Sequence, residues 1–332
     1  MNKKERARVI KRYMSMYGNL VKTDKTSLAR IILSENPDIV LDSWKNPEET
    51  MRSRIRYYAG MSGASSKHNR EIPKDGVKIL IYDIEVLPLR AFVWGVFKQF
   101  IDTKTSLITD RNLMLTHAYK WLGEDETFYD ALTPEEIEAE DDSRIVLSLS
   151  EAMNEADVII GYNLDRYDNR HVNAHRARLG MSPLNPFESI DLMKIAKKQF
   201  YLIRYTLAYV CSFLGLEQKT ETGGMQLWID CWKGKQDAID KMVEYNIQDV
   251  KLTEDLYLRM RAWIHNHPNL NHYADYDEDV CPKCGSYELE YIGEKRTQIN
   301  AFDAYKCKNC GGLMQKRLSN LNKDTRPRLK SI

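Results

Sequence analysis

KILIYDIEV, residues 78–86, is an apolar run that carries two carboxylates near its end, one residue apart. Such a run predicts a β-strand, and in a strand residues i and i+2 point to the same side. Asp83 and Glu85 would therefore face one site. Two anions held this close repel each other unless a cation or a shared proton neutralises them, and carboxylate oxygens suit Mg²⁺ or Mn²⁺. The alternative is a strand that leaves the core with two solvated acids.

A second acidic residue follows another short apolar run. Val158 to Ile160 stops at Gly161, and the sequence GYNLDRYD then leads to Asp168. A helix that begins near Tyr167 would place Asp168 in its first turn, beside the end of the preceding strand. Without further motifs, an acid at this position more often caps the helix or interacts with its dipole.

A third pattern lies in the helix predicted over residues 236–263. Tyr245 and Asp249 are four residues apart, so they share one helical face. A buried tyrosine with a hydrogen-bonded aspartate is the alternative interpretation of this pair.

Together the three motifs resemble those of the DEDD exonuclease superfamily in its tyrosine-containing branch, DEDDy. The order is D-x-E on a first strand, N-x-x-x-Y-D opening a helix, and Y-x-x-x-D late on a helix, over residues 77–263. The resemblance is greatest to proofreading exonuclease domains of family-B DNA polymerases and to their stand-alone phage and bacterial relatives. Residues 204–210 and 213–216 are similar to a further segment of that group. The resemblance implies an α/β, ribonuclease H-like fold: a mixed five-stranded sheet with flanking helices.

The resemblance also implies a role for each motif residue in phosphodiester hydrolysis with two Mg²⁺ or Mn²⁺ ions. Asp83 would bridge both ions, Glu85 and Asp249 would hold the ion that activates water, and Asp168 would help to hold the second. Tyr245 would orient the attacking water, because a phenol with a pKa near 10 is a poor general base.

Four neighbouring residues have open roles. Val86 and Leu87 correspond to positions that contact the terminal base in relatives, although core packing is an equal alternative. Asn163 matches the motif asparagine and would contact the substrate backbone. Asp191 follows the strand-like residues 187–190, where capping of a helix is favoured over a place in the site.

The C-terminal cysteines predict a structural zinc site. The pairs Cys281/Cys284 and Cys307/Cys310 are each C-x-x-C, separated by 22 residues and followed by Gly285 and Gly311. Four thiolates from two such knuckles suit tetrahedral Zn²⁺ in a zinc ribbon, with two or three strands in the insert, and the rival is a redox dithiol pair. The remaining Cys211 and Cys231 lie in apolar helical contexts that indicate core positions.

Charge is distributed unevenly along the 332 residues. The net charge is +1, yet residues 1–75 carry 16 Lys/Arg against 9 Asp/Glu, and residues 281–332 carry 11 against 5. An acidic middle with two basic ends suggests a metal-binding centre flanked by modules that hold a polyanion, unless the basic ends are merely solvated. No apolar run is long enough to span a membrane, and no secretory signal is evident.

The chain divides into five predicted parts: a helical, helix-turn-helix-like basic module (1–60), a linker (61–75), the exonuclease domain (76–265), a zinc ribbon (275–315) and a basic tail (316–332). In the first part, three helices lie near residues 3–16, 27–36 and 47–58, and the third bears Arg52, Arg54 and Arg56. In the exonuclease domain, further strands are predicted over 91–97 and 115–121, an exposed acidic segment over 134–142, and a helix over 144–154.

These patterns predict a metal-dependent 3′–5′ exonuclease that acts on single-stranded or frayed DNA ends. A 3′–5′ exoribonuclease is the nearest alternative, since the motifs do not show whether a 2′-hydroxyl is contacted. A non-catalytic nucleic-acid-binding protein is the alternative from another class. We expect a nucleic-acid partner, a replication or repair protein in trans, no membrane contact, and a location in bacterial or phage-infected host cytoplasm.

Overall fold

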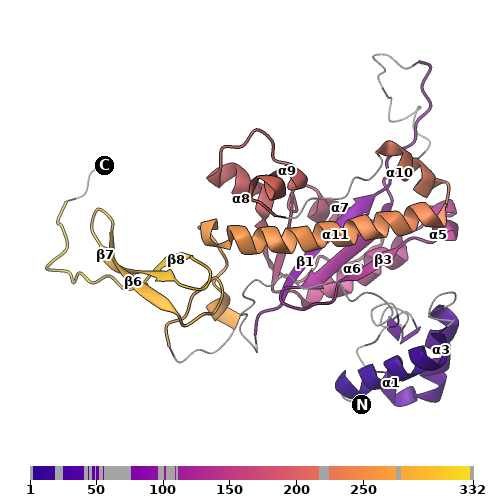
Figure 1. Cartoon of the computed structure of the whole chain (residues 1–332), viewed down its shortest axis with the longest axis horizontal. Coiled ribbons are helices and arrows are strands. Elements are labelled where there is room, and N and C mark those ends of the chain that lie inside the picture. Colours follow the sequence, from indigo (N-terminus) through magenta and orange to yellow (C-terminus); the bar gives the residue numbers. More distant parts are fainter. Residues whose placement is uncertain are drawn as a thin grey trace.

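The structure is a computed structural model, shown in Figure 1. It describes residues 3–18, 25–40, 44, 47–48, 50–51, 55, 76–95, 101, 109, 111–216, 224–273 and 278–329.

A mixed five-stranded sheet forms the centre of the molecule. Its strands lie in the order β3-β2-β1-β4-β5, with β1 antiparallel to β2 and parallel to β4. The strands are β1 (Ile79–Val86), β2 (Met114–Trp121), β3 (Phe128–Ala131), β4 (Val158–Gly161) and β5 (Glu188–Asp191). The predicted sheet and the predicted strands at 78–86 and 115–121 are therefore confirmed.

The two faces of β1 enter two different cores, because its side chains alternate. Leu80, Tyr82 and Ile84 pack with α6 (Ser143–Glu155) and α7 (Asp168–Arg178). Ile79 and Ile81 pack with α11 (Gln236–Met260), which crosses the sheet in Figure 1. The odd-numbered Asp83 and Glu85 continue the α11 side of the strand.

The remaining helices of this domain are α5 (Pro134–Glu138), α8 (Leu192–Gln199), α9 (Leu207–Phe213) and α10 (Met225–Trp232). The helix predicted over 144–154 is confirmed as α6, and the long helix predicted over 236–263 is α11 followed by a 3₁₀ turn at Arg261–Trp263. Cys211 and Cys231 are buried in the core, as predicted.

The prediction of a strand over 91–97 is wrong for the described residues 91–95. Only Ala91 forms an isolated bridge, and Phe92 and Trp94 are 76% and 107% exposed. Aromatic residues favour strands only where a neighbouring strand and a core receive them. Here both edges of β1 are already taken by β2 and β4.

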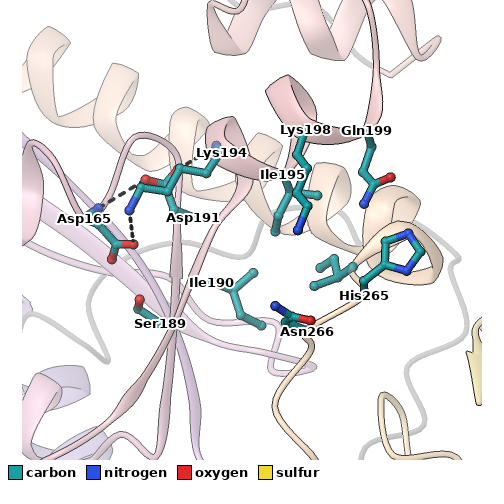
Figure 2. A pocket seen from close by; sticks show the side chains of 11 residues that line it. Asp165, Ser189, Ile190, Asp191, Lys194, Ile195, Lys198, Gln199, His265 and Asn266 are labelled. Atoms are coloured by element: carbon teal, nitrogen blue, oxygen red, sulfur yellow. Dashed lines mark hydrogen bonds and ion pairs between the residues drawn. The ribbon is translucent and has the colours of Figure 1, made fainter. Parts of the chain in front are cut away.

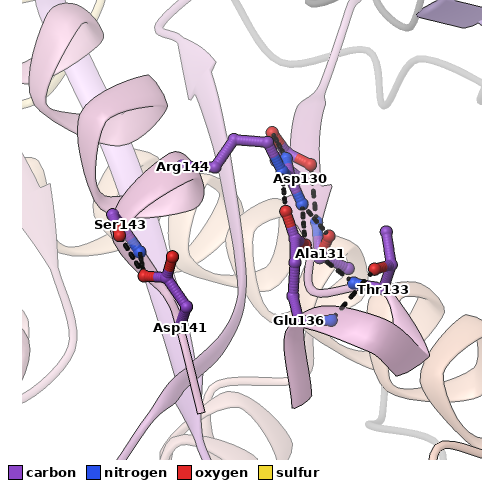
Figure 3. A network of polar contacts seen from close by, with 7 residues as sticks. All are labelled: Asp130, Ala131, Thr133, Glu136, Asp141, Ser143 and Arg144. Carbon is purple, nitrogen blue, oxygen red and sulfur yellow. Dashed lines mark hydrogen bonds and ion pairs between the residues drawn. The ribbon is translucent and has the colours of Figure 1, made fainter. Parts of the chain in front are cut away.

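The acidic segment 134–142 is only partly exposed, although an exposed segment was predicted. Thr133 caps α5 in a capping box with Glu136. Arg144 then donates to Glu136 and Asp130 at 2.6 Å, as Figure 3 shows. Asp142, at the end of the segment, is fully buried and pairs with His175 and Arg178. The cost of burying these acidic side chains is reduced because each is paired with a cationic or hydrogen-bonding partner.

The N-terminal helices α1 (Lys3–Met16) and α3 (Lys25–Glu35) confirm the first two predicted helices. They enclose a small core that includes Ile10, Leu28 and Ile32. Residues 47–48, 50–51 and 55 of the third predicted helix are helical, whereas Arg52, Arg54, Arg56 and the linker 61–75 lie outside the described residues.

The C-terminal ribbon is a separate antiparallel sheet of β6 (Leu289–Arg296), β7 (Ala301–Cys307) and β8 (Leu313–Gln315). It lies against the end of α11 in Figure 1. Lys283 Nζ donates to the carbonyl of Ala262 at 3.0 Å, and Leu270 N donates to Pro282 O at 2.8 Å. Among the described residues, none of the helices is long and apolar enough to cross a membrane.

Candidate metal centre and active site

Three carboxylates converge where β1 passes beneath α11. Asp83 and Glu85 come from the strand and Asp249 from the helix, and a carboxylate oxygen of each lies within 4.8 Å of the others. Asp249 is 5% exposed. The strand's alternation sends the first two acids to the helix side, and packing of Val243, Ile247 and Val250 against the sheet fixes the turn of α11 that bears the third.

This donor set fits a divalent metal ion. Carboxylates at such separations repel one another, and a cation among them removes that cost. Their oxygens are the hard ligands that Mg²⁺ and Mn²⁺ prefer. The three acids of this group are the ones that the sequence motifs single out in β1 and α11.

Asn246 holds one of these acids in place. Its side chain is fully buried, and its Nδ2 donates to Asp83 Oδ2 at 2.6 Å. The sequence motifs did not identify Asn246, because the motif on this helix consists of Tyr245 and Asp249, which are four residues apart. Asn246 stands three residues before Asp249, which is also a same-face spacing, so the signal was present.

Asp168 lies beside the three-acid group rather than within it. It is in the first turn of α7, as predicted, and its Oδ1 accepts a 3.4 Å hydrogen bond from the backbone N–H of Ile84, between Asp83 and Glu85. The carboxyl is 4% exposed, and burial raises its pKa to about 7. A nearby cation would restore the charged form.

Tyr167 faces the same acids. Burial is the main reason that its pKa is raised to about 12, and the charges of Glu85, Asp168 and Asp83 add to the effect. The side chain nevertheless remains 42% exposed, so its ring borders both the acids and the solvent. The sequence placed it in the second motif without giving it a role.

Asp191 shapes the turn that leads to Asp168. It caps α8, as predicted, by accepting hydrogen bonds from Met193 N and Lys194 N. The same carboxylate accepts from Asn163 N at 3.1 Å and from Asp165 N at 3.3 Å. Figure 2 shows Asp191 between Asp165 and the helix that bears Lys194. The carboxylate therefore ties the end of β4 to α8.

Asn163 occupies a special backbone position in that turn. Its φ is 61°, in the left-handed region that asparagine tolerates better than most residues. Its side-chain Oδ1 is buried and accepts no hydrogen bond from the described residues.

Tyr245, Val86 and Leu87 all contribute to the core beneath the acids. Tyr245 is half-buried on α11, one turn before Asp249. Val86 is 7% exposed and Leu87 is fully buried, so their burial supports the packing alternative over contact with a substrate base.

The four ribbon cysteines also converge. The sulfur atoms of Cys281 and Cys310, and of Cys284 and Cys307, are 3.6 Å apart, and all four lie within 4.8 Å of one another. Tetrahedral Zn²⁺ with Zn–S bonds of about 2.3 Å places its sulfurs roughly 3.8 Å apart. The cluster therefore fits a closed four-thiolate zinc site.

Two buried cations support this fit. Arg261 and Lys283 are 4% and 6% exposed. Burial lowers the pKa of Lys283, and the neighbouring Cys310 and Cys281 oppose that shift. The pKa of Arg261 is raised in spite of its burial, by Tyr257, Cys284 and Cys310. Four thiolates and one Zn²⁺ carry a net charge of −2, which two nearby cations offset. Lys283 also bonds to Ala262, so the same residue joins the ribbon to the end of α11.

Comparison with known proteins gives one family match. Residues 99–261 match the model of the RNase_H superfamily. This match and the mixed sheet show a ribonuclease H-like fold, and they support a nuclease with a nucleic-acid substrate. No curated protein matches the chain.

Among solved structures, one similar chain is the family B DNA polymerase from the hyperthermophilic archaeon Pyrobaculum calidifontis. The two chains share 15% sequence identity with a TM-score of 0.42, over 68% of this chain and 33% of the polymerase. This chain thus spans about a third of the polymerase's length.

Proposed function

We propose that this chain, whose central domain is ribonuclease H-like, is a metal-dependent 3′–5′ exonuclease that shortens single-stranded or frayed DNA ends. The observation that carries the proposal is the convergence of Asp83, Glu85 and Asp249 on this fold, with Asp168 bonded to the strand between the first two. The direction of digestion and the preference for DNA rest on the resemblance to DEDDy exonucleases.

In this proposal each acid has a distinct place. Asp83 is central, because it is oriented by Asn246 and belongs to the same group as Glu85 and Asp249. Glu85 and Asp249 would hold one divalent ion with it, and Asp168 would complete the site of a second. When bound, such ions lower the pKa of the attacking water and offset the charge of the phosphate.

Tyr245 would hold the water in line with the phosphorus atom. In this role the phenol orients the water by hydrogen bonding, and the metal ion makes its deprotonation easier. Asn163, in the turn before Asp168, would contact the substrate backbone.

The test is a digestion time course with Mg²⁺ or Mn²⁺ on matched 5′-labelled DNA and RNA oligonucleotides, single- and double-stranded. Asp249→Ala and Asp240→Ala form a matched pair, since both lie on α11 and only Asp249 belongs to the acid group. Wild type and Asp240→Ala should produce a ladder that shortens from the 3′ end of DNA. Asp249→Ala should produce none.

The other outcomes change the proposal in defined ways. A ladder on RNA alone would replace DNA by RNA as the substrate, and the protein would become an exoribonuclease. No ladder on any substrate, with tight binding of oligonucleotides, would favour a binding protein. A ladder on DNA would favour a role in replication or repair.

A further inference from the structure

A cavity of about 380 Å³ lies between the ribbon and the segment that follows α11. Pockets for small organic groups usually measure about 300–1,000 Å³. By comparison, the cavity beside α8 in Figure 2 measures only about 200 Å³. The ribbon cavity is therefore the better candidate for a ligand that the proposed active site does not account for.

The lining of the ribbon cavity combines an aromatic ring with cations. Tyr305 on β7 is half-buried, and Lys316 Nζ lies 5.9 Å from its ring centroid and 3.7 Å from Oδ2 of Asp279, an exposed acid that also lines the cavity. Arg317 is next to Lys316 in the chain and also lines the cavity. Apolar side chains, among them Leu289 and Met314, complete the wall. A flat ring beside positive charges suits a nucleobase and its phosphate.

Asn271 adds a polar group to the same wall. Its Nδ2 donates to Val280 O at 3.2 Å, while its Oδ1 is buried and accepts no hydrogen bond from the described residues. A buried acceptor without a donor is costly, so a ligand N–H that satisfies it would gain stability. The exocyclic amino and ring N–H groups of nucleobases are such donors.

We infer that this cavity binds one nucleobase of a single-stranded substrate, stacked on Tyr305, with the adjoining phosphate at Lys316 and Arg317. This inference rests on the proposed function, because it treats the occupant as part of the strand being digested. The positive balance of residues 281–332 favours a polyanion over a neutral or cationic partner.

The cavity is remote from the proposed cleavage site. Asp249 and Met260, the last residue of α11, are eleven positions apart, which corresponds to about 16 Å at 1.5 Å per residue. The bound base would therefore lie several nucleotides upstream of the 3′ end. A very short oligonucleotide could be cleaved without reaching the ribbon.

The experiment measures binding of labelled single-stranded oligonucleotides of 4 and 20 nucleotides, in the Asp249→Ala background so that they are not digested. Tyr305→Leu removes the stacking ring but keeps an apolar side chain, and Tyr305→Phe keeps the ring. Tyr287→Leu is the matched control, because Tyr287 is an exposed ribbon tyrosine outside the cavity.

Tyr305→Leu should weaken binding of the 20-mer about 5- to 150-fold, and the 4-mer should be unaffected. Tyr305→Phe and Tyr287→Leu should bind as the background protein does. Lys316→Ala combined with Arg317→Ala should reduce the slope of log K against log salt by about 1.4, since two phosphate contacts are lost.

Equal binding of the 20-mer by the Tyr305→Leu and Tyr287→Leu proteins, with zinc content intact, would overturn the inference. If the Tyr305→Leu protein loses its zinc, the variant with Lys316→Ala and Arg317→Ala provides the test instead. An unchanged slope of log K against log salt in that variant would overturn the inference. Cleavage of the 4-mer by the wild-type protein tests the proposed function separately, so a failed pocket and a failed active site give different results.

Discussion

Asn246 determines where Asp83 can lie, through a 2.6 Å hydrogen bond in a fully buried position. Asn246→Leu keeps the number and branching of the side-chain heavy atoms but removes the donor. We expect activity or apparent metal affinity to fall about 10- to 100-fold, because residues that orient metal ligands have effects of that size. The dependence of the cleavage rate on Mn²⁺ concentration measures this loss.

A double-mutant cycle supplies the control for Asn246. If the asparagine acts through Asp83, adding Asn246→Leu to Asp83→Asn should cost almost nothing further. Additive losses, or a wild-type response of folded Asn246→Leu to Mn²⁺, would refute this positioning role.

A substitution of Asp191 can distinguish its contacts with the turn before Asp168 from its role as the N-cap of α8. Asparagine is as good an N-cap as aspartate, yet its amide has only one oxygen to offer to four backbone N–H groups. In Asp191→Asn the amide NH₂ must face Asp165 N–H or the other donors, which should displace the turn before Asp168. We expect the kcat to fall at least about tenfold, with little change in unfolding temperature.

The matched control for Asp191 is Thr206→Ala, which removes the N-cap of α9 far along the chain from that turn. It should lower stability by about 1 kcal/mol and leave the kcat unchanged. A parallel loss of kcat and stability in both variants would show that Asp191 acts only as a cap.

At the scale of elements, a buried ion pair joins α11 to β2. Lys120 and Glu254 bond directly, their side chains are 4% and 5% exposed, and Glu254 Oε1 also accepts from Gly123 N. Glu254→Gln leaves the lysine uncompensated, so we expect a loss of about 3–5 kcal/mol in the free energy of unfolding. Urea denaturation measures it.

The double variant Lys120→Met with Glu254→Leu tests the cause of that loss. Replacing both partners by apolar side chains removes the uncompensated charge, so most of the stability should return. A double variant as unstable as Glu254→Gln would show that the geometry of the pair, rather than its burial, holds α11 in place.

The elements that were predictable are those with a regular apolar period. The alternation in β1 placed Asp83 and Glu85 on one side, and the spacing of four placed Tyr245 and Asp249 on one helical face. The same reasoning was wrong for residues 91–95, because their aromatic composition resembles a strand although both edges of the preceding strand β1 are taken by β2 and β4. The burial of Asp142 depended on His175 and Arg178, which are distant in sequence.

At the scale of the whole molecule, the ribbon should be an independent stabilising unit. Cys281→Ser with Cys284→Ser removes half of the proposed zinc ligands, so we expect loss of zinc and unfolding of β6 to β8, measured by metal content and proteolysis. Cleavage of short oligonucleotides should persist. Loss of all activity with an intact ribbon would contradict this division.

The connection between the two units could not be predicted from motifs. The cysteine spacing indicated the zinc site, but it did not show that Arg261, at the end of α11, and Lys283 would lie buried beside the thiolates. Nor did it show the cavity that Asn269 and Asn271 line together with Tyr305 and Lys316. Such features arise from packing between segments, which local periodicity does not encode.

The most direct test of the central claim is the digestion of a 5′-labelled single-stranded DNA by Asp83→Ala beside the wild-type protein, with Mn²⁺ and with folding verified by circular dichroism. Asp83 is the acid that Asn246 orients and that shares the cluster with Glu85 and Asp249. The account predicts a 3′-shortened ladder for wild type and none for the variant. A wild-type rate in folded Asp83→Ala would contradict it.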